Sequence, residues 1–578
     1  MAGPTAPKDP EKARPFFYIL KDKDIFGERQ KDGTGIQFIY ESDGRLINSA
    51  QITGNVTDKE ELRLLETVEG FGRLVHSIGV SVETDRPEET AEFVFQMYGK
   101  KDLYGGGTNL TTSLKCDGME HRIYLSDYRW TEDDHVPGQI KILFAAPERM
   151  GKVSVRLFLN DGYEAPPEEE DLVIDMHSEE YCGMISRSLL QLGNPYRIRK
   201  AIEKSKAGKE VTLAYIGGSI TQGAGAIPIH TECYAYKSFQ LFQNRFSTQN
   251  NVRFIKAGVG GTPSELGMIR FDRDVLREGE RPDIVVIEFA VNDEGDETKG
   301  VCYESLVRKV LKLPWKPAVV LLFSVFANDW NLQERLRPVG DLYDLPMVSI
   351  LNAVTPQFSL KCGEGRILSK NQFFYDIFHP NNTGHTIMAD CLQYLFERCD
   401  AAEPARIGTF VEGMTEEQIL SEKLSGPAVI GADFERIFLL DKKNRYVGAK
   451  IRAGSFTSTD MELQSVEMDG NLIQTPEFPY NWMYDGSRPQ MAGFEMEIIC
   501  KSLFLIFKDS GEMDVGKANV FVNDVYCMTA DPHKNNWLHC NAVLLFWETE
   551  SRSHKVRITV TEEDRNKKFT ILGFGYTI

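Results

Sequence analysis

Apolar residues in the middle of the chain recur in short continuous runs, each followed by a longer segment of helical periodicity. The runs are Val211–Ile216, Val252–Ala257, Ile284–Glu288, Ala318–Phe323 and Met347–Leu351. The helical patterns are Tyr236–Phe246, Ser264–Arg277, Tyr303–Leu313, Leu332–Pro338 and Thr383–Arg398. Continuous apolar strands that alternate with helices predict a parallel sheet covered on both faces. We therefore expect an α/β domain from residue 176 to 405.

Both flanks show a different pattern, in which short runs alternate between apolar and polar residues. The N-terminal runs include Ile78–Val82, Ala91–Gln96 and Val153–Phe158, and the C-terminal ones are Val556–Thr561 and Phe569–Ile578. Turns rich in Gly, Asp, Asn and Pro separate them, which is typical of antiparallel β-sandwiches. We expect one such domain over residues 1–175 and another over 406–578. The linkers are predicted at Glu164–Asp171 and near Thr415–Gly426.

Composition and charge exclude several classes of protein. The chain has 578 residues, 42% of them hydrophobic and 26% charged, as in folded globular domains. Its net charge of −19 repels phosphate backbones and anionic lipid surfaces, so nucleic acid is not an expected partner. No apolar run approaches the roughly 20 residues of a membrane helix, and no membrane partner is expected. The first 14 residues lack the apolar stretch of a secretory signal, which predicts a cytoplasmic location.

A serine follows the first apolar run, in the sequence Ile216-Gly217-Gly218-Ser219-Ile220-Thr221-Gln222-Gly223. Open α/β sheets bind their ligands at the carboxyl ends of the strands, a location that suits a nucleophile. A phosphate-binding loop or an ordinary turn is the alternative. The Gly-Lys-Ser/Thr of a P-loop is absent, however, and Thr221 stands where the α/β-hydrolase elbow Gly-x-Ser-x-Gly has its second glycine.

Asp376 and His379 lie three residues apart, in the loop before the last helical pattern. The carboxylate can accept the Nδ1 proton of the imidazole and leave Nε2 facing outward as a base. Alternatively, Asp376 caps a turn and His379 is a surface residue before a proline.

Two more turns follow successive apolar runs. Gly258-Val259-Gly260-Gly261-Thr262 comes after the second run, and Asn292-Asp293 comes after the third. The alternative is that each segment is an ordinary turn at the end of a strand. Loops after successive parallel strands nevertheless lie on one edge of the sheet, so we expect these segments to meet.

Together these residues resemble the SGNH, or GDSL-type, hydrolase superfamily, named for a Ser, a Gly, an Asn and a His in four separate blocks. The order and spacing of the blocks match over about residues 200–398. The resemblance implies a flavodoxin-like three-layer domain, with the flanking β-sandwiches jelly-roll-like. It assigns Ser219 as nucleophile, His379 as base and Asp376 as the acid that orients it. The oxyanion hole would consist of the N–H groups of Ser219 and Gly261 and the amide of Asn292.

The sequence departs from the family pattern at two positions. Gly218 replaces the usual Asp before the serine, and Ala290 stands where the third block often has Gly. Both lie outside the reacting atoms. Gly260 is an alternative to Gly261 as the oxyanion donor, because the loop can align with the family pattern one residue earlier.

The resemblance extends, by analogy, to multidomain carbohydrate acetylesterases. It implies a serine esterase that removes O-acetyl groups from oligosaccharides such as acetylated xylo- or manno-oligosaccharides. A lipase or thioesterase acting on other acyl esters, and a non-catalytic glycan-binding protein, remain alternatives. We expect no metal and no other cofactor, because the histidines are dispersed and neither His-Glu-x-x-His nor paired Cys spacing occurs.

Substrate contacts are expected from residues near the same sheet edge. Gln222 belongs to the serine loop, and Trp330 follows the fourth apolar run. Tyr480, Trp482 and Tyr484 alternate in the C-terminal region and can form a sugar platform, although a packed sheet face is the favoured interpretation.

Overall fold

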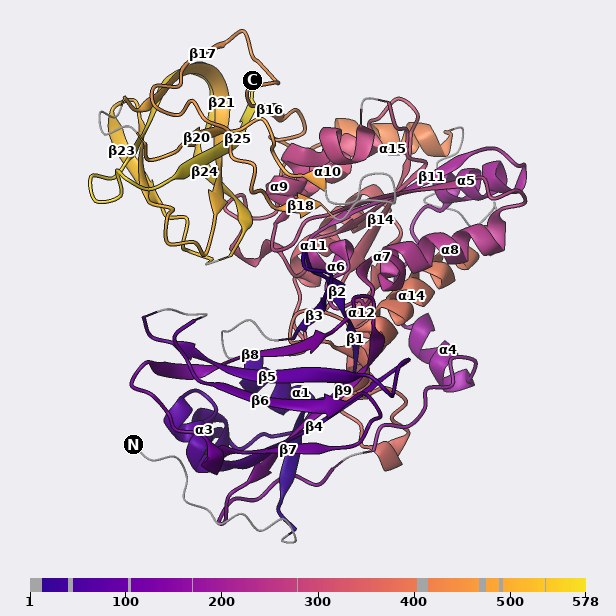
Figure 1. Cartoon of the computed structure of the whole chain (residues 1–578). Helices are drawn as coiled ribbons and strands as arrows, with labels where there is room; N and C mark the ends of the chain where they lie inside the picture. Colours follow the sequence, from indigo (N-terminus) through magenta and orange to yellow (C-terminus); the bar gives the residue numbers. More distant parts are fainter. Residues whose placement is uncertain are drawn as a thin grey trace.

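The computed structural model describes residues 13–39, 45–101, 105–168, 170–277, 279–402, 414–466, 475–487, 492–535 and 537–578. Three sheet-containing parts follow one another along the chain (Figure 1). The N-terminal strands, in indigo and purple, lie at the bottom of the view. The C-terminal strands, in yellow, lie at the upper left, and the α/β domain lies at the right.

Two antiparallel sheets form the N-terminal part, and their inward side chains share one core. The first has the order β1 (Phe16–Phe26), β9 (Met150–Leu159), β4 (Val75–Thr84) and β7 (His121–Tyr124). The second has the order β2 (Glu28–Arg29), β3 (Gly35–Phe38), β8 (Asp134–Phe144), β5 (Thr90–Gly99) and β6 (Asn109–Lys115). The three predicted N-terminal runs lie in β4, β5 and β9. Three short helices were not predicted: α1 (Arg45–Ile52), α2 (Lys59–Leu64) and α3 (Val68–Leu74).

The middle of the chain forms a six-stranded sheet. Its order is β10 (Leu189–Gln191), β15 (Met347–Ser349), β14 (Ala318–Phe323), β13 (Ile284–Glu288), β11 (Val211–Gly217) and β12 (Val252–Gly258). Strands β11 to β15 are parallel, and β10 pairs antiparallel at one edge. The parallel strands thus follow the doubly wound order 2-1-3-4-5, in which the chain reverses direction across the sheet between β11 and β13. That reversal is where such sheets bind their ligands.

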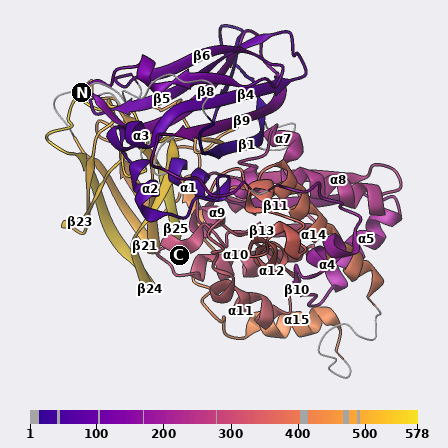
Figure 2. The same cartoon turned by 90° about the horizontal axis from the view of Figure 1, so that it is seen from below.

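Helices cover both faces of this sheet (Figure 2). The core of one face includes residues of α4 (Glu179–Ser186), α5 (Tyr196–Lys206), α8 (Tyr234–Phe246), α12 (Ile350–Phe358) and α14 (Asn382–Ala401). The core of the other includes α9 (Ser264–Phe271), α10 (Val301–Leu311), α11 (Gln333–Tyr343) and α15 (Glu416–Ser425). Short helices α6 (Ser219–Gln222), α7 (Ile229–Glu232) and α13 (Lys370–Phe373) lie in the connections.

Several predicted boundaries were wrong. The fifth strand ends at Ser349, because the Ser349 hydroxyl caps α12. The helix predicted to end at Pro338 continues to Tyr343, since Val339 and Tyr343 bury their side chains in the core. The helix predicted over Ser264–Arg277 is α9 followed by a π-helix, Asp272–Leu276.

The predicted linker near Thr415–Gly426 is helix α15. Thr415 and Gln418 form a reciprocal capping box at its start, and Leu424 is buried against the neighbouring helices. The signal Thr-x-x-Gln was present in the sequence.

The C-terminal part is built on one sheet of long antiparallel strands. Its order is β16 (Phe438–Leu440), β25 (Phe569–Thr577), β21 (Phe494–Asp509), β24 (His539–Val560), β22 (Ala518–Val522) and β23 (Val525–Ala530). Strands β17 (Ala449–Arg452) and β20 (Trp482–Tyr484) pair with it, and β18 (Ser465–Val466) pairs with β19 (Thr475–Pro476). Phe504 and Ile506 of β21 belong to the same buried cluster as α9 and α10. This sheet therefore shares a core with the α/β domain.

Candidate active site

Ser219 lies at the turn between β11 and α6, on the ligand-binding edge of the sheet. The strand is fully buried and ends at Gly217, and Gly218 is the residue before the helix. The turn needs glycine at Gly217, because a Cβ there would come within 2.1 Å of Thr221 Oγ1. Gly223, with φ +108°, ends the helix in the left-handed region. This tight turn leaves the Ser219 side chain only partly buried.

His379 and Asp376 complete a hydrogen-bonded chain with Ser219. His379 Nε2 lies 3.0 Å from Ser219 Oγ, and His379 Nδ1 lies 2.9 Å from Asp376 Oδ2. The other oxygen, Asp376 Oδ1, accepts the N–H groups of Phe378 and His379, at 2.8 and 2.9 Å. The carboxylate is thereby fixed in the orientation that places a protonated Nδ1 against it. The predicted convergence of these three side chains, 160 residues apart along the chain, is present in the structure.

A second histidine in the same region does structural work. His385 is fully buried in α14, where its Nδ1 accepts the N–H of Tyr234 at 3.1 Å and its Nε2 donates to the carbonyl of Ala224 at 3.1 Å. Burial lowers the pKa of His385 to about 3. It stays neutral and holds the loop after α6 in place.

Asn292 follows β13 and lies against the serine turn. A Cβ on Gly218 would come within 2.2 Å of Asn292 Oδ1 and 2.6 Å of its Nδ2. In the described part of the chain, Oδ1 is buried without a hydrogen-bond partner. A side chain at position 218 would therefore collide with Asn292 as it is placed here.

The loop after β12 lies beside the same turn. A Cβ on Gly258 would come within 2.0 Å of the Gln222 nitrogen, and one on Gly260 within 2.8 Å of Gln222 Oε1. Gly261 adopts φ +69° and is exposed, whereas Gly260 is buried. The loops after β11, β12 and β13 are thus in mutual contact.

A buried arginine supports the ends of two of these strands. Arg270 of α9 is fully buried and donates to the carbonyls of Gly217 and Ala257, both at 2.8 Å. Its charge is matched by Asp274 at 2.9 Å. Because the carbonyls at both strand ends are tied to one rigid guanidinium, the Ser219 and Gly261 loops are held in a fixed relation.

Buried carboxyl groups lie beneath the site. Glu288, the last residue of β13, is fully buried and accepts the Thr221 hydroxyl at 3.0 Å. Burial raises the pKa of Glu288 to about 7. Asp293, next to Asn292, accepts the N–H of Ser264 at 2.7 Å, and burial raises its pKa to about 8. Through these hydrogen bonds, Glu288 supports the serine turn and Asp293 supports the start of α9.

Each flanking domain contributes residues that were not predicted. Lys23 of β1 is buried and donates to the carbonyls of Phe374 and Asn371, next to the Asp376 loop. From the C-terminal domain, Gln464 and His539 form hydrogen bonds with the glycine loop after β12. These contacts join residues 204 to 351 positions apart along the chain, and no local pattern in the sequence indicates them.

The residues expected to contact substrate lie at different distances from Ser219 and His379. Gln222 lies at the glycine loop, as described above. Trp330 is half-buried and stacks on Phe326, with ring centroids 5.8 Å apart. Phe326 contacts Phe378, the residue before His379, at 5.1 Å. Through Phe326 and Phe378, Trp330 is linked to His379 by a chain of ring contacts.

The C-terminal aromatic platform does not exist as an open surface. Trp482 and Tyr484 are 5% and 1% exposed within the core of the C-terminal sheet, and only Tyr480 is exposed. The favoured interpretation, a packed sheet face, was correct.

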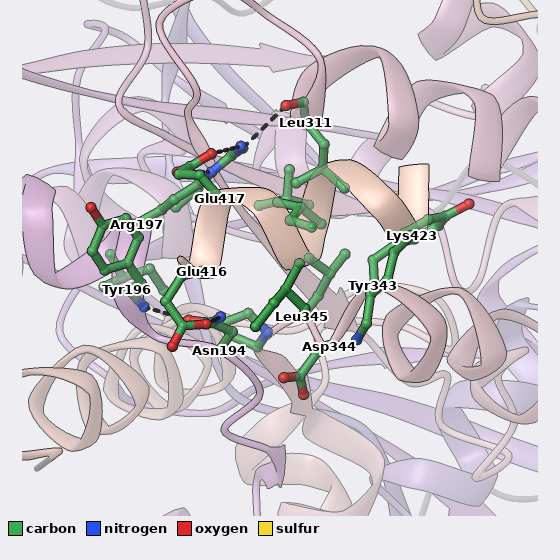
Figure 3. Close-up of a pocket in the computed structure, with 16 residues that line it drawn as sticks. Asn194, Tyr196, Arg197, Leu311, Tyr343, Asp344, Leu345, Glu416, Glu417 and Lys423 are labelled. Carbon is green, nitrogen blue, oxygen red and sulfur yellow. Dashed lines mark hydrogen bonds and ion pairs between the residues drawn. The ribbon is translucent and has the colours of Figure 1, made fainter. Parts of the chain in front are cut away.

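A separate small pocket lies where α15 meets α5 and α11 (Figure 3). Arg197 points to Glu417 at 2.9 Å and donates to the carbonyls of Leu311 and Pro317. Asn194 contacts Glu416 at the other end. Because its polar groups already pair with one another, this pocket is a helix-docking joint.

No group of three or more His, Cys, Asp or Glu side chains among the residues that the structure describes is arranged to hold a metal ion. Nor does any helix in the described ranges combine the length and apolar character needed to cross a membrane.

Comparison with known proteins gives matches of two kinds. Residues 215–387, which contain all the side chains of the candidate site that come from the α/β domain, match the GDSL-like lipase/acylhydrolase family. A solved two-domain esterase (CEX) active on acetylated mannans has 24% sequence identity and a TM-score of 0.55, over 68% of this chain and 98% of that one. Its structure co-crystallized with mannopentaose gives 24% identity and a TM-score of 0.53 over the same shares. No curated protein matches the chain.

Proposed function

We propose that this carboxylic ester hydrolase removes O-acetyl groups from oligosaccharides through an acyl-enzyme on Ser219. The match of residues 215–387 to the GDSL-like lipase/acylhydrolase family supports the ester chemistry. The observation that carries this proposal is the hydrogen-bonded chain of Ser219, His379 and Asp376. It has the order and orientation that a serine nucleophile, its base and the base's orienting acid require.

In the first half of the reaction, His379 Nε2 removes the Ser219 proton as Oγ attacks the acetyl carbonyl carbon. General base catalysis of this kind contributes typically 10²–10⁴-fold. Asp376 holds the ring in the tautomer with Nδ1 protonated and stabilises the imidazolium that forms. His379 then donates the proton to the departing sugar hydroxyl, which leaves the acetyl group on Ser219.

The negative charge on the carbonyl oxygen needs preorganised donors. The Ser219 N–H, the Gly261 N–H and the Asn292 side-chain amide are the candidates, since their three loops are in contact. Each donor of this kind contributes about 2.7–4 kcal/mol to the barrier reduction. In the second half, His379 activates water, which attacks the acyl-enzyme and releases acetate.

The substrate class is proposed from the comparisons and from the residues around the site. The two similar solved structures are of an esterase active on acetylated mannans, which favours acetylated manno-oligosaccharides. Trp537 lies directly against Gly261, and its side chain is 43% exposed; Phe378, beside His379, is 39% exposed. Exposed aromatic rings beside the candidate site suit the apolar faces of sugars.

Acetate release tests the proposal. Purified full-length protein is incubated with acetylated manno- and xylo-oligosaccharides, with 4-nitrophenyl acetate and with long-chain acyl esters. We expect acetate from the oligosaccharides and at least a 10⁴-fold loss in Ser219→Ala. Cleavage of long acyl esters without release of acetate from sugars would favour a lipase or thioesterase instead. Sugar binding without turnover of any ester would leave a glycan-binding protein.

A further inference from the structure

Resting on the proposed function, we infer that the C-terminal domain sets the geometry of the oxyanion hole, with Gln464 and His539 as positioning residues for the Gly260–Gly261 loop. These residues bind two successive carbonyls of the loop that carries the proposed Gly261 donor. The C-terminal domain is then part of the catalytic apparatus and goes beyond an appended module.

Gln464 holds the peptide that bears the Gly261 N–H. Its Nε2 donates to the carbonyl of Gly260 at 3.0 Å, and its Oε1 accepts the N–H of Cys540 at 3.0 Å. Since a backbone N–H can only donate and a carbonyl can only accept, these two partners fix which end of the amide faces the loop. The side chain is 8% exposed, so water competes little for either bond.

The hydrogen bond at the Gly260 carbonyl also constrains the N–H of Gly261. The carbonyl of Gly260 and the N–H of Gly261 belong to one planar trans peptide, in which they point in opposite directions. The bond from Gln464 to the Gly260 carbonyl therefore fixes the plane of this peptide and with it the direction of the Gly261 N–H. Hydrogen bonding at the carbonyl also polarises the same amide and strengthens its N–H as a donor.

His539 fixes the next peptide. Its Nε2 donates to the carbonyl of Gly261 at 3.0 Å, and its Nδ1 lies 3.1 Å from Asp509 Oδ2 and 3.2 Å from Asn535 Nδ2. Asp509 is fully buried. The ring is thus locked by partners from its own domain while it reaches into the neighbouring one.

The indole of Trp537 limits the loop from the outside. A Cβ on Gly261 would lie 2.8 Å from Trp537 Cζ2 and 3.2 Å from His539 Cδ2. The Trp537 and His539 rings are 4.7 Å apart. With a left-handed φ of +69° and these rings against its Cα, position 261 favours glycine.

Gln464→Glu tests the inference with the smallest change of shape. The variant keeps an oxygen for the Cys540 N–H but presents an oxygen instead of an NH₂ group to the Gly260 carbonyl. We expect kcat for 4-nitrophenyl acetate to fall about 10- to 100-fold, less than the 10²–10³-fold typical of deleting an oxyanion donor. KM should stay within about twofold, because the donor acts on the transition state.

Glu297→Gln is the matched control. Glu297 accepts the N–H of Leu544 across the same domain interface, without contact to the glycine loop. This variant should keep wild-type kcat. If Gln464→Glu does not fold, as judged by circular dichroism and thermal unfolding, Gln464→Met replaces it, since it removes the donor without adding charge. His539→Gln is expected to lower kcat in the same way.

The result that overturns the inference is a folded Gln464 variant with kcat within twofold of wild type. Failure of the proposed function looks different: the wild type itself then turns over no ester, or Ser219→Ala remains active. A Gln464 variant whose kcat and KM change by equal factors would also contradict a positioning role.

Discussion

Gly218→Ala is a sharp probe of how Asn292 is placed. The added Cβ would lie 2.2 Å from Asn292 Oδ1, 2.5 Å from its Cγ and 2.6 Å from its Nδ2, whereas Cβ contacts under 3.0 Å are essentially never found. Asn292 must therefore move by about 0.8 Å. A misplacement of about 1 Å at a reacting centre can reduce the rate about 10²-fold, or about 2.7 kcal/mol. We expect kcat to fall by this order.

A double-mutant cycle separates this effect from general damage. Asn292→Ala alone should lower kcat about 10²–10³-fold. If Gly218→Ala acts through Asn292, the double variant is no slower than Asn292→Ala, because the displaced amide is already gone. Gly183→Ala in α4 is the matched control, since a Cβ there meets nothing within 4 Å. The kcat of wild type and of the four variants is measured by steady-state hydrolysis of 4-nitrophenyl acetate.

Two results would refute this reasoning. One is a Gly218→Ala enzyme with wild-type kcat, which would mean that Asn292 relaxes without consequence. The other is full additivity in the cycle, which would place the damage at the Ser219 turn itself.

Three more predictions concern stability. Glu288→Gln should be as stable as wild type near pH 4.5 and more stable than wild type by on the order of 3 kcal/mol at pH 7, because the raised pKa of Glu288 lowers the stability of the wild-type folded state across that range. A difference in free energy of unfolding between the two proteins that does not change with pH would contradict this. Burial lowers the pKa of Lys23 to about 8 from 10.5, so the stability of wild type relative to Lys23→Met should rise between those pH values, and a constant difference in denaturant midpoint would argue against it. Arg197→Met breaks an ion pair with Glu417 whose side chains are 11% and 18% exposed, and should cost about 3 kcal/mol in calorimetry without changing kcat; a loss of kcat in the folded variant would show that the α15 joint reaches the active site.

The strands, and the meeting of Ser219, His379 and Asp376, could be predicted because each segment carries its own local signal. Fully buried parallel strands are continuous apolar runs, and their carboxyl ends meet on one edge, so the residues after them were expected together. His379, in the loop before the last helix, was expected at the same edge, and it lies beside Ser219 although the two are 160 positions apart.

What could not be predicted depends on tertiary contact. The sequence predicts a helix end at Pro338. The helix continues because the free energy gained by burying Val339 and Tyr343 exceeds the cost of the hydrogen bond that the proline removes. Gln464 and His539 carry no motif, because their role comes from where the C-terminal sheet docks on α9. The close approach of Asn292 to Gly218 likewise arises only in the folded chain.

The central claim is that one serine hydroxyl, activated by His379, attacks the ester. Its most direct test is mass-spectrometric mapping of the adduct formed by a 4-nitrophenyl phosphonate. We predict one adduct per chain, on the peptide that contains Ser219, formed in proportion to the loss of esterase activity. Inactivation with the phosphonate attached to another residue, or full labelling of Ser219 with activity intact, would contradict the account.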